Sequence, residues 1–268
     1  MMDNAFFGSP GQQAVQRRAD ALWPLLALHP DYCCHGRAIG VAGTARDAGE
    51  KLAALARLQG VASHEGVPAD QIAAQRAFLE ARGLKMDHFN NWAADRTALT
   101  RARDVLASRG FPDDLTMHAV TPDTPAETLQ RLDAMTQSCE VLLPMGSFLR
   151  GTRRPAVCLY AQDGEGRVVG SAASVAQFHP DSPQSHIAWW GMLATAPDRR
   201  GAGISLILGA QTLLAMQDRY GIGHFFTGIR AGNAPSESLC TKLGLSDDGT
   251  VVIIAIDPGA FDGDRITK

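Results

Sequence analysis

The pattern of apolar positions from residue 187 onward predicts a strand, a turn and a helix in direct succession. Bulky and β-branched residues run from 187 to 195, and Ala-Pro-Asp and the glycine-rich turn 199–203 follow. An apolar-rich helical pattern begins at Ile204. The first turn of such a helix leaves several backbone N–H groups unpaired at the positive end of the helix dipole. The segment 186–218 therefore predicts a site for a phosphate or pyrophosphate group.

The same kind of pattern extends over the rest of the chain from Leu115. Alternating apolar positions and turn residues predict the order β, α, α, β, β, β, α, β, α, β. Beyond the segment described above, the expected strands cover 115–121, 156–162, 168–178, 224–229 and 249–256. The expected helices cover 126–137, 141–149 and 233–243.

The pattern before residue 110 is different, because helical spacing dominates it. Helices are expected at 12–29 with an interruption at Pro24, and then at 45–58, 69–81 and 91–108. A short strand is expected only within the glycine-rich piece 35–44. The pair Asp113-Asp114 marks a boundary, so we predict a mostly helical region 1–112 and a second domain 113–268.

Composition and charge narrow the class of protein. The 268 residues are 45% hydrophobic, enough for ordinary cores, and the net charge of −3 with scattered Lys and Arg predicts no nucleic-acid partner. Five cysteines without CxxC spacing predict neither a disulfide framework nor a metal site, and they fit a reducing cytoplasm. The start, MMDNAFFGSPGQQ, lacks the pattern of a secretory leader, and no apolar run is long enough to span a membrane.

Two sequence motifs indicate which ligand the glycine-rich turn 199–203 is expected to bind. The run Thr195-Ala196-Pro197-Asp198-Arg199-Arg200-Gly201-Ala202-Gly203-Ile204-Ser205 resembles V-x-P-x-x-[RQ]-x-x-G-x-[GA], with serine in the last position. The run Asn233-Ala234-Pro235-Ser236-Glu237-Ser238-Leu239-Cys240-Thr241-Lys242-Leu243-Gly244-Leu245 resembles N-x-x-[AS]-x-x-L-Y-x-K-x-G-F. Both patterns are those of the acetyl-coenzyme A dependent GNAT N-acetyltransferases, which the chain resembles over roughly 115–257.

The resemblance implies a fold and a coenzyme site. The implied fold is α/β (α+β): a mixed, mostly antiparallel central sheet with flanking helices, here preceded by the mostly helical region. Strands four and five of that fold separate and hold the pantetheine arm and the acyl carbonyl, and the loop holds the pyrophosphate. The residues implied to bind the coenzyme are Leu193, Ala194, Thr195, Arg200, Gly201, Ala202, Gly203, Ile204, Ser205, Asn233 and Ser236.

The proton-transfer residues stay open at this stage. Cys240 stands where many members carry a tyrosine near the coenzyme sulfur, so it is either a proton donor or a small packed residue. His186 is a candidate base acting through water, or a solvated loop residue. Strand alternation sends Trp189 and Trp190 to opposite faces, so at most one of them borders the substrate.

The resemblance implies transfer of an acetyl group from acetyl-coenzyme A to a primary amine of a small molecule or peptide, by direct attack in a ternary complex and without a metal. The alternative, motivated by Cys240, is an acyl-coenzyme A binding module with impaired catalysis and a regulatory or interaction role. The region 1–112 is interpreted as an independent helical domain or as a degenerate second acetyltransferase half. It is expected to shape the acceptor pocket or a homodimer contact.

Overall fold

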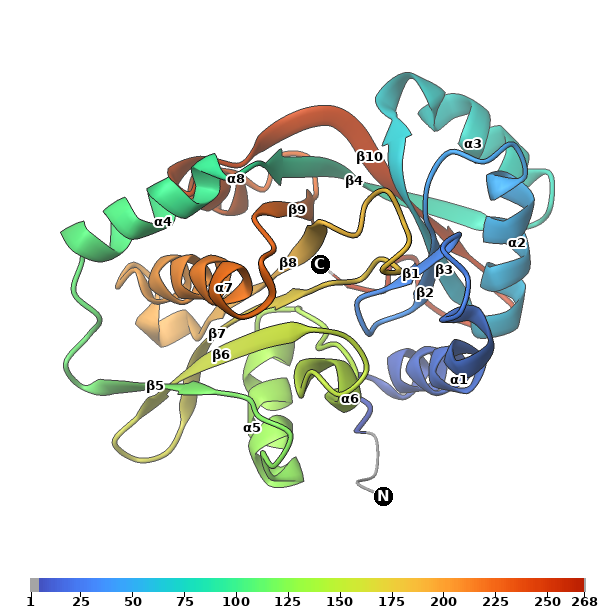
Figure 1. The fold of residues 1–268 in the computed structure, drawn as a ribbon. Coiled ribbons are helices and arrows are strands. Elements are labelled where there is room, and N and C mark those ends of the chain that lie inside the picture. Colours follow the sequence, from blue (N-terminus) through green and yellow to red (C-terminus); the bar gives the residue numbers. More distant parts are fainter. Residues whose placement is uncertain (1–4, 268) are drawn as a thin grey trace.

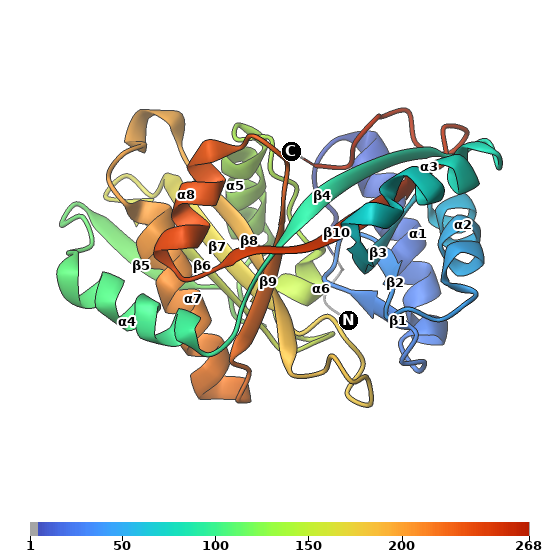
Figure 2. The same ribbon diagram turned by 90° about the horizontal axis from the view of Figure 1, so that it is seen from above.

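All ten strands of the described chain form one sheet. The computed structural model describes residues 5–267, so the first four residues of the N-terminal stretch considered above lie outside it. The strand order is β1-β2-β3-β10-β4-β9-β8-β7-β6-β5, and most neighbours are antiparallel (Figures 1 and 2). The pairs β2–β3 and β8–β9 are parallel. The mixed, mostly antiparallel sheet with flanking helices is the predicted fold class.

The elements after residue 113 follow the predicted order. The strands are β5 (Leu115–Ala119), β6 (Ala156–Asp163), β7 (Val168–Val175), β8 (Ile187–Thr195), β9 (His224–Ile229) and β10 (Ser246–Ile256). The helices are α5 (Ala126–Gln137), α6 (Gly146–Leu149), α7 (Ile204–Tyr220) and α8 (Ala234–Lys242), with a 3₁₀ turn η2 (Pro197–Arg199). Helix α7 covers β6, β7 and β8 on one face, and α5 packs against β7 and β8 on the other (Figure 2).

The region before residue 113 contains more strand than its sequence predicts. Its helices are α1 (Pro10–Leu26), α2 (Ala48–Gln59), α3 (Ile72–Glu80) and α4 (Thr97–Ser108), with a 3₁₀ turn η1 (Ala69–Gln71). Its strands are β1 (Tyr32–Cys34), β2 (Ile39–Val41), β3 (Val61–Pro68) and β4 (Lys85–Ala94). The expectation of a mostly helical region with one short strand was wrong for β1, β3 and β4, and the helix expected at 91–108 begins only at Thr97.

The physical reason lies in the side chains of these two strands. Strand β3 buries polar residues such as Ser63, His64 and Glu65, and β4 carries Asn90 and Asn91, so neither segment shows clean apolar alternation. Both strands obtain their hydrogen bonds from β10, more than 150 residues further along the chain. Partners so distant leave no local pattern in the sequence.

Both halves of the chain repeat one topology and exchange a strand. In the first half, β1 and β2 pair antiparallel, α2 crosses over, and β3 lies parallel to β2. In the second half, β7, β8, α7 and β9 repeat this arrangement. Strand β10 then lies between β3 and β4, while β4 lies between β9 and β10. The two halves therefore complete one another's part of the sheet.

This exchange predicts that residues 113–268 do not fold alone. Within the described chain, both neighbours of β10 come from the first half, and the fragment would leave buried apolar residues such as Ile253, Ile254 and Ile256 without cover. We expect the fragment to be insoluble or to lack a cooperative urea transition, and co-expression with residues 1–112 to restore both properties. A soluble fragment that unfolds cooperatively would instead support the predicted division at residue 113.

Candidate functional site

A cavity of about 650 Å³ opens where β8 and β9 separate. The two strands pair in parallel only from Ile187 opposite His224 to Trp189 opposite Phe226. Beyond this point β8 stays with β7 and β9 stays with β4, so backbone groups of both strands face the gap. The gap gives an extended chemical group a place to form strand-like hydrogen bonds.

A β-bulge shapes the β8 side of the gap. The register between β7 and β8 shifts between the pairs Ser171–Ala194 and Ala173–Gly191, and Met192 in between has a φ of 58°. Such a φ is uncommon for a residue other than glycine. Ser171 Oγ donates a hydrogen bond to the Met192 carbonyl at 2.8 Å, which fixes the bulge. Leu193, Ala194 and Thr195 directly follow it and line the cavity.

The glycine-rich turn forms one end of the cavity. Gly201 and Gly203 have φ values of 84° and 76°, in the left-handed region that glycine adopts without strain. Gly203 is the N-cap of α7, which runs for 17 residues, and no side chain caps this helix end. The first N–H groups of α7 are therefore available to an anion, and the helix dipole favours negative charge there.

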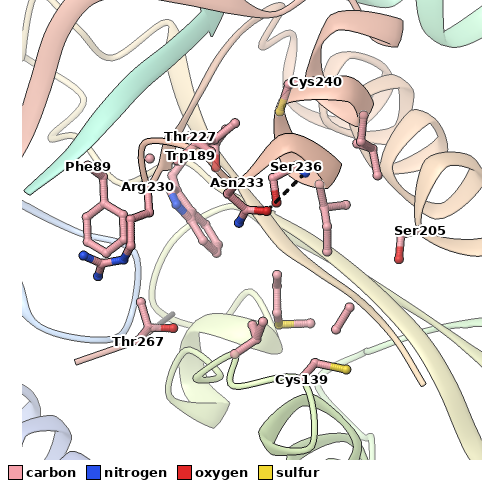
Figure 3. A pocket seen from close by; sticks show the side chains of 18 of the residues that line it. Phe89, Cys139, Trp189, Ser205, Thr227, Arg230, Asn233, Ser236, Cys240 and Thr267 are labelled. Carbon is pink, nitrogen blue, oxygen red and sulfur yellow. Dashed lines mark hydrogen bonds between the residues drawn. The ribbon is translucent and has the colours of Figure 1, made fainter. Parts of the chain in front are cut away.

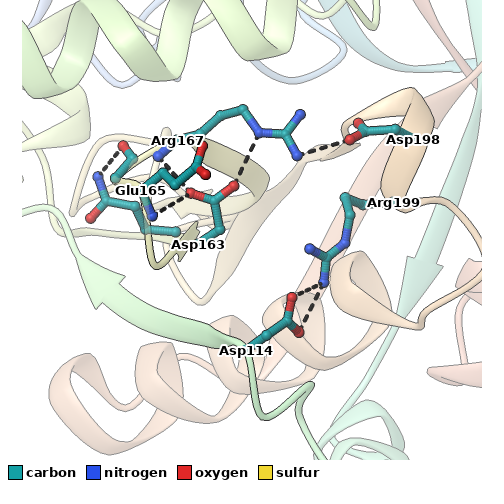
Figure 4. A network of polar contacts seen from close by, with 8 residues as sticks. Asp114, Asp163, Glu165, Arg167, Asp198 and Arg199 are labelled. Atoms are coloured by element: carbon teal, nitrogen blue, oxygen red, sulfur yellow. Dashed lines mark hydrogen bonds and ion pairs between the residues drawn. The ribbon is translucent and has the colours of Figure 1, made fainter.

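Ion pairs hold the turn in place. Arg199 Nη2 lies 2.8 Å from Asp114 Oδ2, and Arg167 Nη2 lies 2.8 Å from Asp198 Oδ2 (Figure 4). Arg167 also contacts Asp163 through Nε at 3.1 Å. Arginines 199 and 167 are thereby occupied by carboxylates within the protein. Arg109 beside Gly203 and Arg200 in the turn line the cavity, as does Lys242 at the end of α8, and none of these three forms an ion pair within residues 5–267.

The second motif, residues 233–245, contributes the α8 side of the cavity wall. Asn233 is the N-cap of α8, and its Oδ1 accepts a hydrogen bond from the Ser236 N–H at 3.4 Å (Figure 3). Asn233, Ser236 and Cys240 all line the cavity, opposite Ser205 at the start of α7. The hydroxyls of Thr195 and Ser205 hydrogen bond to each other and so join the end of β8 to α7.

Nearly all sequence-derived coenzyme residues meet at this one cavity. Its walls include Leu193, Ala194, Thr195, Arg200, Gly201, Gly203, Ile204, Ser205, Asn233 and Ser236. Ala202 lies in the turn but does not line the cavity. The two motifs are therefore neighbours in space, although their roles in binding stay a prediction.

The two catalytic candidates have different positions. Cys240 lines the cavity but is 1% exposed, and burial raises the pKa of its thiol to about 12. A thiol with this pKa is a poor proton donor to a thiolate whose own pKa is about 8.5. His186 is exposed and does not line the cavity. Its ring forms a T-shaped contact with the ring of His224, with the two ring centroids 4.9 Å apart. The structure therefore does not bring His186 to the site.

The two tryptophans separate as alternation predicts. Trp190 is fully buried, and its indole N–H donates to the Gly209 carbonyl of α7 at 3.2 Å. Trp189 lines the cavity instead, where the His35 ring stacks on it at 4.5 Å.

The first half of the chain also lines this cavity, through residues that the sequence did not single out. Its contribution comprises His35, Arg37, Ala38, Val61, Ala62, Ser63, Glu65, Phe89 and Arg109. Strands β3 and β4, which carry five of these residues, reach the cavity through pairing with β10 and β9, while His35, Arg37 and Ala38 come from the connection between β1 and β2. Only Arg109 lies at the phosphate end, where Gly203 is its neighbour.

Comparison with known proteins is informative at the level of structure. No protein-family model matches the chain, and no curated protein matches its sequence. A tandem GNAT protein from the clavulanic acid biosynthesis pathway is similar with a TM-score of 0.54 and 16% identity, over 80% of this chain and 70% of the other. A GCN5-related N-acetyltransferase from Kribbella flavida is similar with a TM-score of 0.52 and 13% identity, over 91% and 96%.

A Drosophila protein is also similar, with a TM-score of 0.54 and 14% identity over 92% of this chain and 89% of that one. At such identities the similarity concerns the fold. The order of strands, the separation of β8 from β9 and the two motifs agree with it. The chain therefore has the fold of the GNAT N-acetyltransferases.

Proposed function

We propose that this protein transfers an acetyl group from acetyl-coenzyme A to a primary amine of a small molecule or peptide. The observation that carries the proposal is the cavity in which the separated strands β8 and β9 lead directly to the uncapped start of α7. This arrangement offers hydrogen bonds to an amide-containing arm at one end and an anion site at the other. A coenzyme A thioester has both features.

In the proposed complex, the pantetheine arm lies between β8 and β9, and backbone groups of Leu193, Ala194 and Thr195 face it. The turn from Arg200 to Ser205 binds the pyrophosphate through N–H groups, where glycines permit close approach. Arg109, Arg200 and Lys242 add positive charge for the coenzyme phosphates. Asn233 and Ser236 close the site from α8.

The reaction follows from this placement. A neutral amine beside the thioester attacks its carbonyl carbon directly, with binding supplying the proximity and orientation of the two reactants. Backbone N–H groups in the gap stabilise the oxyanion that forms. Because the pKa of Cys240 is high, we propose that the departing sulfur takes the proton released by the attacking nitrogen rather than one from Cys240.

The test is a coupled measurement of binding and turnover. Acetyl-coenzyme A is titrated into the protein by calorimetry, and release of free thiol is then followed with a panel of aromatic, aliphatic and peptide amines. The proposal predicts binding and amine-dependent thiol release. The burial of Cys240 favours a second candidate, a coenzyme-binding module with a regulatory role, which predicts binding without release by any amine.

We further propose that the first half of the chain is a degenerate acetyltransferase copy. The repeat of an antiparallel pair, a crossover helix and a parallel strand in both halves supports this origin. In the first half, helix α2 follows β2, the first strand of the parallel pair. Helix α2 begins at Ala48, and the motif of residues 195–205 has no counterpart before it. The copy would then serve the acceptor side of the cavity and not a second coenzyme.

A further inference from the structure

One buried carboxyl group lies in the part of the cavity wall that the first half supplies. Glu65 is on β3 and is 5% exposed. Ser63 Oγ donates a hydrogen bond to Glu65 Oε1 at 2.9 Å. Within residues 5–267, no Lys, Arg or His forms an ion pair with it. A buried carboxylate normally has a cationic partner. Glu65 instead lines the cavity, so a cationic ligand in the cavity could supply that partner.

The backbone at Glu65 is irregular in a way that turns this side chain. Strand β10 pairs Val251 with Val67 and Ile253 with His64, so Glu65 and Gly66 together oppose Val252. Gly66 has a φ of 69°. This is a β-bulge, a feature that re-aims a side chain and is common beside active sites. The bulge gives a structural reason why a carboxyl group stands at the cavity wall.

The groups around Glu65 do not neutralise it. His35 is uncharged at neutral pH, because burial and the nearby Arg37 lower its pKa to about 3. Arg37 donates through Nε to the Leu142 carbonyl, and its guanidinium lies 5.0 Å from the Trp189 ring. The thiol of Cys33 on β1 also stays neutral, since burial and Glu65 raise its pKa. The neighbouring Gln177 is an uncharged amide.

We propose that Glu65 binds the ammonium group of the acceptor and removes its proton before the amine attacks the thioester. The inference rests on the proposed function and adds the acceptor half of the site to it. Burial raises the pKa of Glu65 to about 7, with Ser63 and Gln177 opposing the shift. A base with this pKa is ionised above neutral pH and still accepts a proton readily.

The proton balance is complete within the site. The carboxylate of Glu65 takes one proton from R–NH₃⁺, which gives the neutral acid and R–NH₂. In a poorly hydrated cavity this neutral pair is favoured over two buried charges. The nitrogen then forms a bond to the acetyl carbon, the carbon–sulfur bond breaks, and a second nitrogen proton passes to the sulfur. Glu65 finally releases its proton to solvent.

The walls near Glu65 indicate the class of acceptor. They include the polar His35, Arg37 and Ser63, but most of their side chains are aromatic or aliphatic: Phe89, Trp189, Phe226, Val61, Val252 and Ile254. Arg230, which also lines the cavity beside Phe89 (Figure 3), donates to both carboxylate oxygens of Asp87 at 2.8 Å, so it is not left to bind an acidic substrate. The acceptor class is therefore a primary amine on an aromatic or aliphatic body.

The experiment uses 2-phenylethylamine as the probe and the full chain saturated with coenzyme A. Calorimetry measures its affinity between pH 6 and pH 8, and thiol release from acetyl-coenzyme A gives kcat/KM over the same range. Because an ionised Glu65 binds the cation, we expect both to rise about tenfold with a midpoint near pH 7. In Glu65→Gln, neither the affinity for 2-phenylethylamine nor kcat/KM should increase with pH, and both should be at least about 90% lower than in the unmodified protein at pH 8. In Glu65→Asp, both should still increase with pH.

Two further variants test whether the pH dependence comes from Glu65 itself. Ser63→Ala removes a hydrogen bond that lowers the pKa of Glu65, so the midpoint should move to higher pH. Glu80→Gln makes the same charge change at an exposed position on α3 and should behave like the unmodified protein. A Glu65→Gln protein with an unchanged pH profile would overturn the inference.

The failure of the inference differs from failure of the proposed function. Coenzyme A binding without any binding of 2-phenylethylamine would overturn the acceptor assignment and leave the coenzyme site standing. Absence of coenzyme binding in the unmodified protein would overturn the proposed function, and with it the role of Glu65.

Discussion

Replacing Gly203 with glutamate is expected to raise the dissociation constant for acetyl-coenzyme A at least about 100-fold, or roughly 3 kcal/mol. The substituted side chain would stand at the N-cap of α7, where we place the pyrophosphate. Its negative charge would oppose that of the phosphates and would also attract Arg109, whose Nη1 lies 3.9 Å from a Cβ at this position. Calorimetric titration with acetyl-coenzyme A measures the loss.

The same helix provides the matched control. Gly221 ends α7 with a φ of 72°, close to the 76° of Gly203, and does not line the cavity. Gly221→Glu therefore introduces the same charge and the same backbone strain at the other end of the helix. We expect it to bind the coenzyme within about threefold of the unmodified protein, since only distant charge effects remain. Equal loss in both variants would point to damage to α7 and would contradict our placement of the pyrophosphate.

The second large effect is expected at Trp190. Its side chain is fully buried against α7, where Gly209 leaves room for the indole ring. Trp190→Ala should lower the free energy of unfolding by about 3 to 5 kcal/mol, through lost burial and the cavity left behind. Urea unfolding followed by circular dichroism measures this change.

Trp189 is the comparison residue, one position earlier on the opposite face of β8. Its ring borders the cavity, so Trp189→Ala enlarges an existing space instead of opening a new one in the core. We expect a smaller loss of stability than for Trp190→Ala, together with weaker binding of 2-phenylethylamine. If the two variants lose the same stability, the division of the two rings between cavity and core is wrong.

The segments that form the proposed coenzyme half of the site could be located from sequence because their determinants are local. Strand β8, the turn with Gly201 and Gly203, and helix α7 follow one another between residues 187 and 220, and each leaves its own pattern. For α8, the N-cap Asn233 and the glycine at 244 after the helix are also local signals, which mark where the helix begins and ends. Their meeting at one cavity then follows from the fold that the motifs implied.

The proposed acceptor half could not be located from sequence, because it depends on contacts between distant segments. Glu65 is one polar residue in a segment without regular alternation, and its strand is defined by pairing with β10. The only local signal is the glycine that follows it, which marks the bulge. His186 illustrates the opposite error: it precedes a site strand in sequence, yet the start of β8 points it away from the cavity.

The most direct test of the central claim is a crystal structure of the protein with bound coenzyme A. Our account predicts pyrophosphate oxygens within hydrogen-bond distance of N–H groups between Gly201 and Ser205. It also predicts the pantetheine arm in the gap beyond Trp189 and Phe226, with its sulfur toward the wall that contains Glu65. Coenzyme bound elsewhere, or a gap that remains empty at saturating coenzyme, would contradict it.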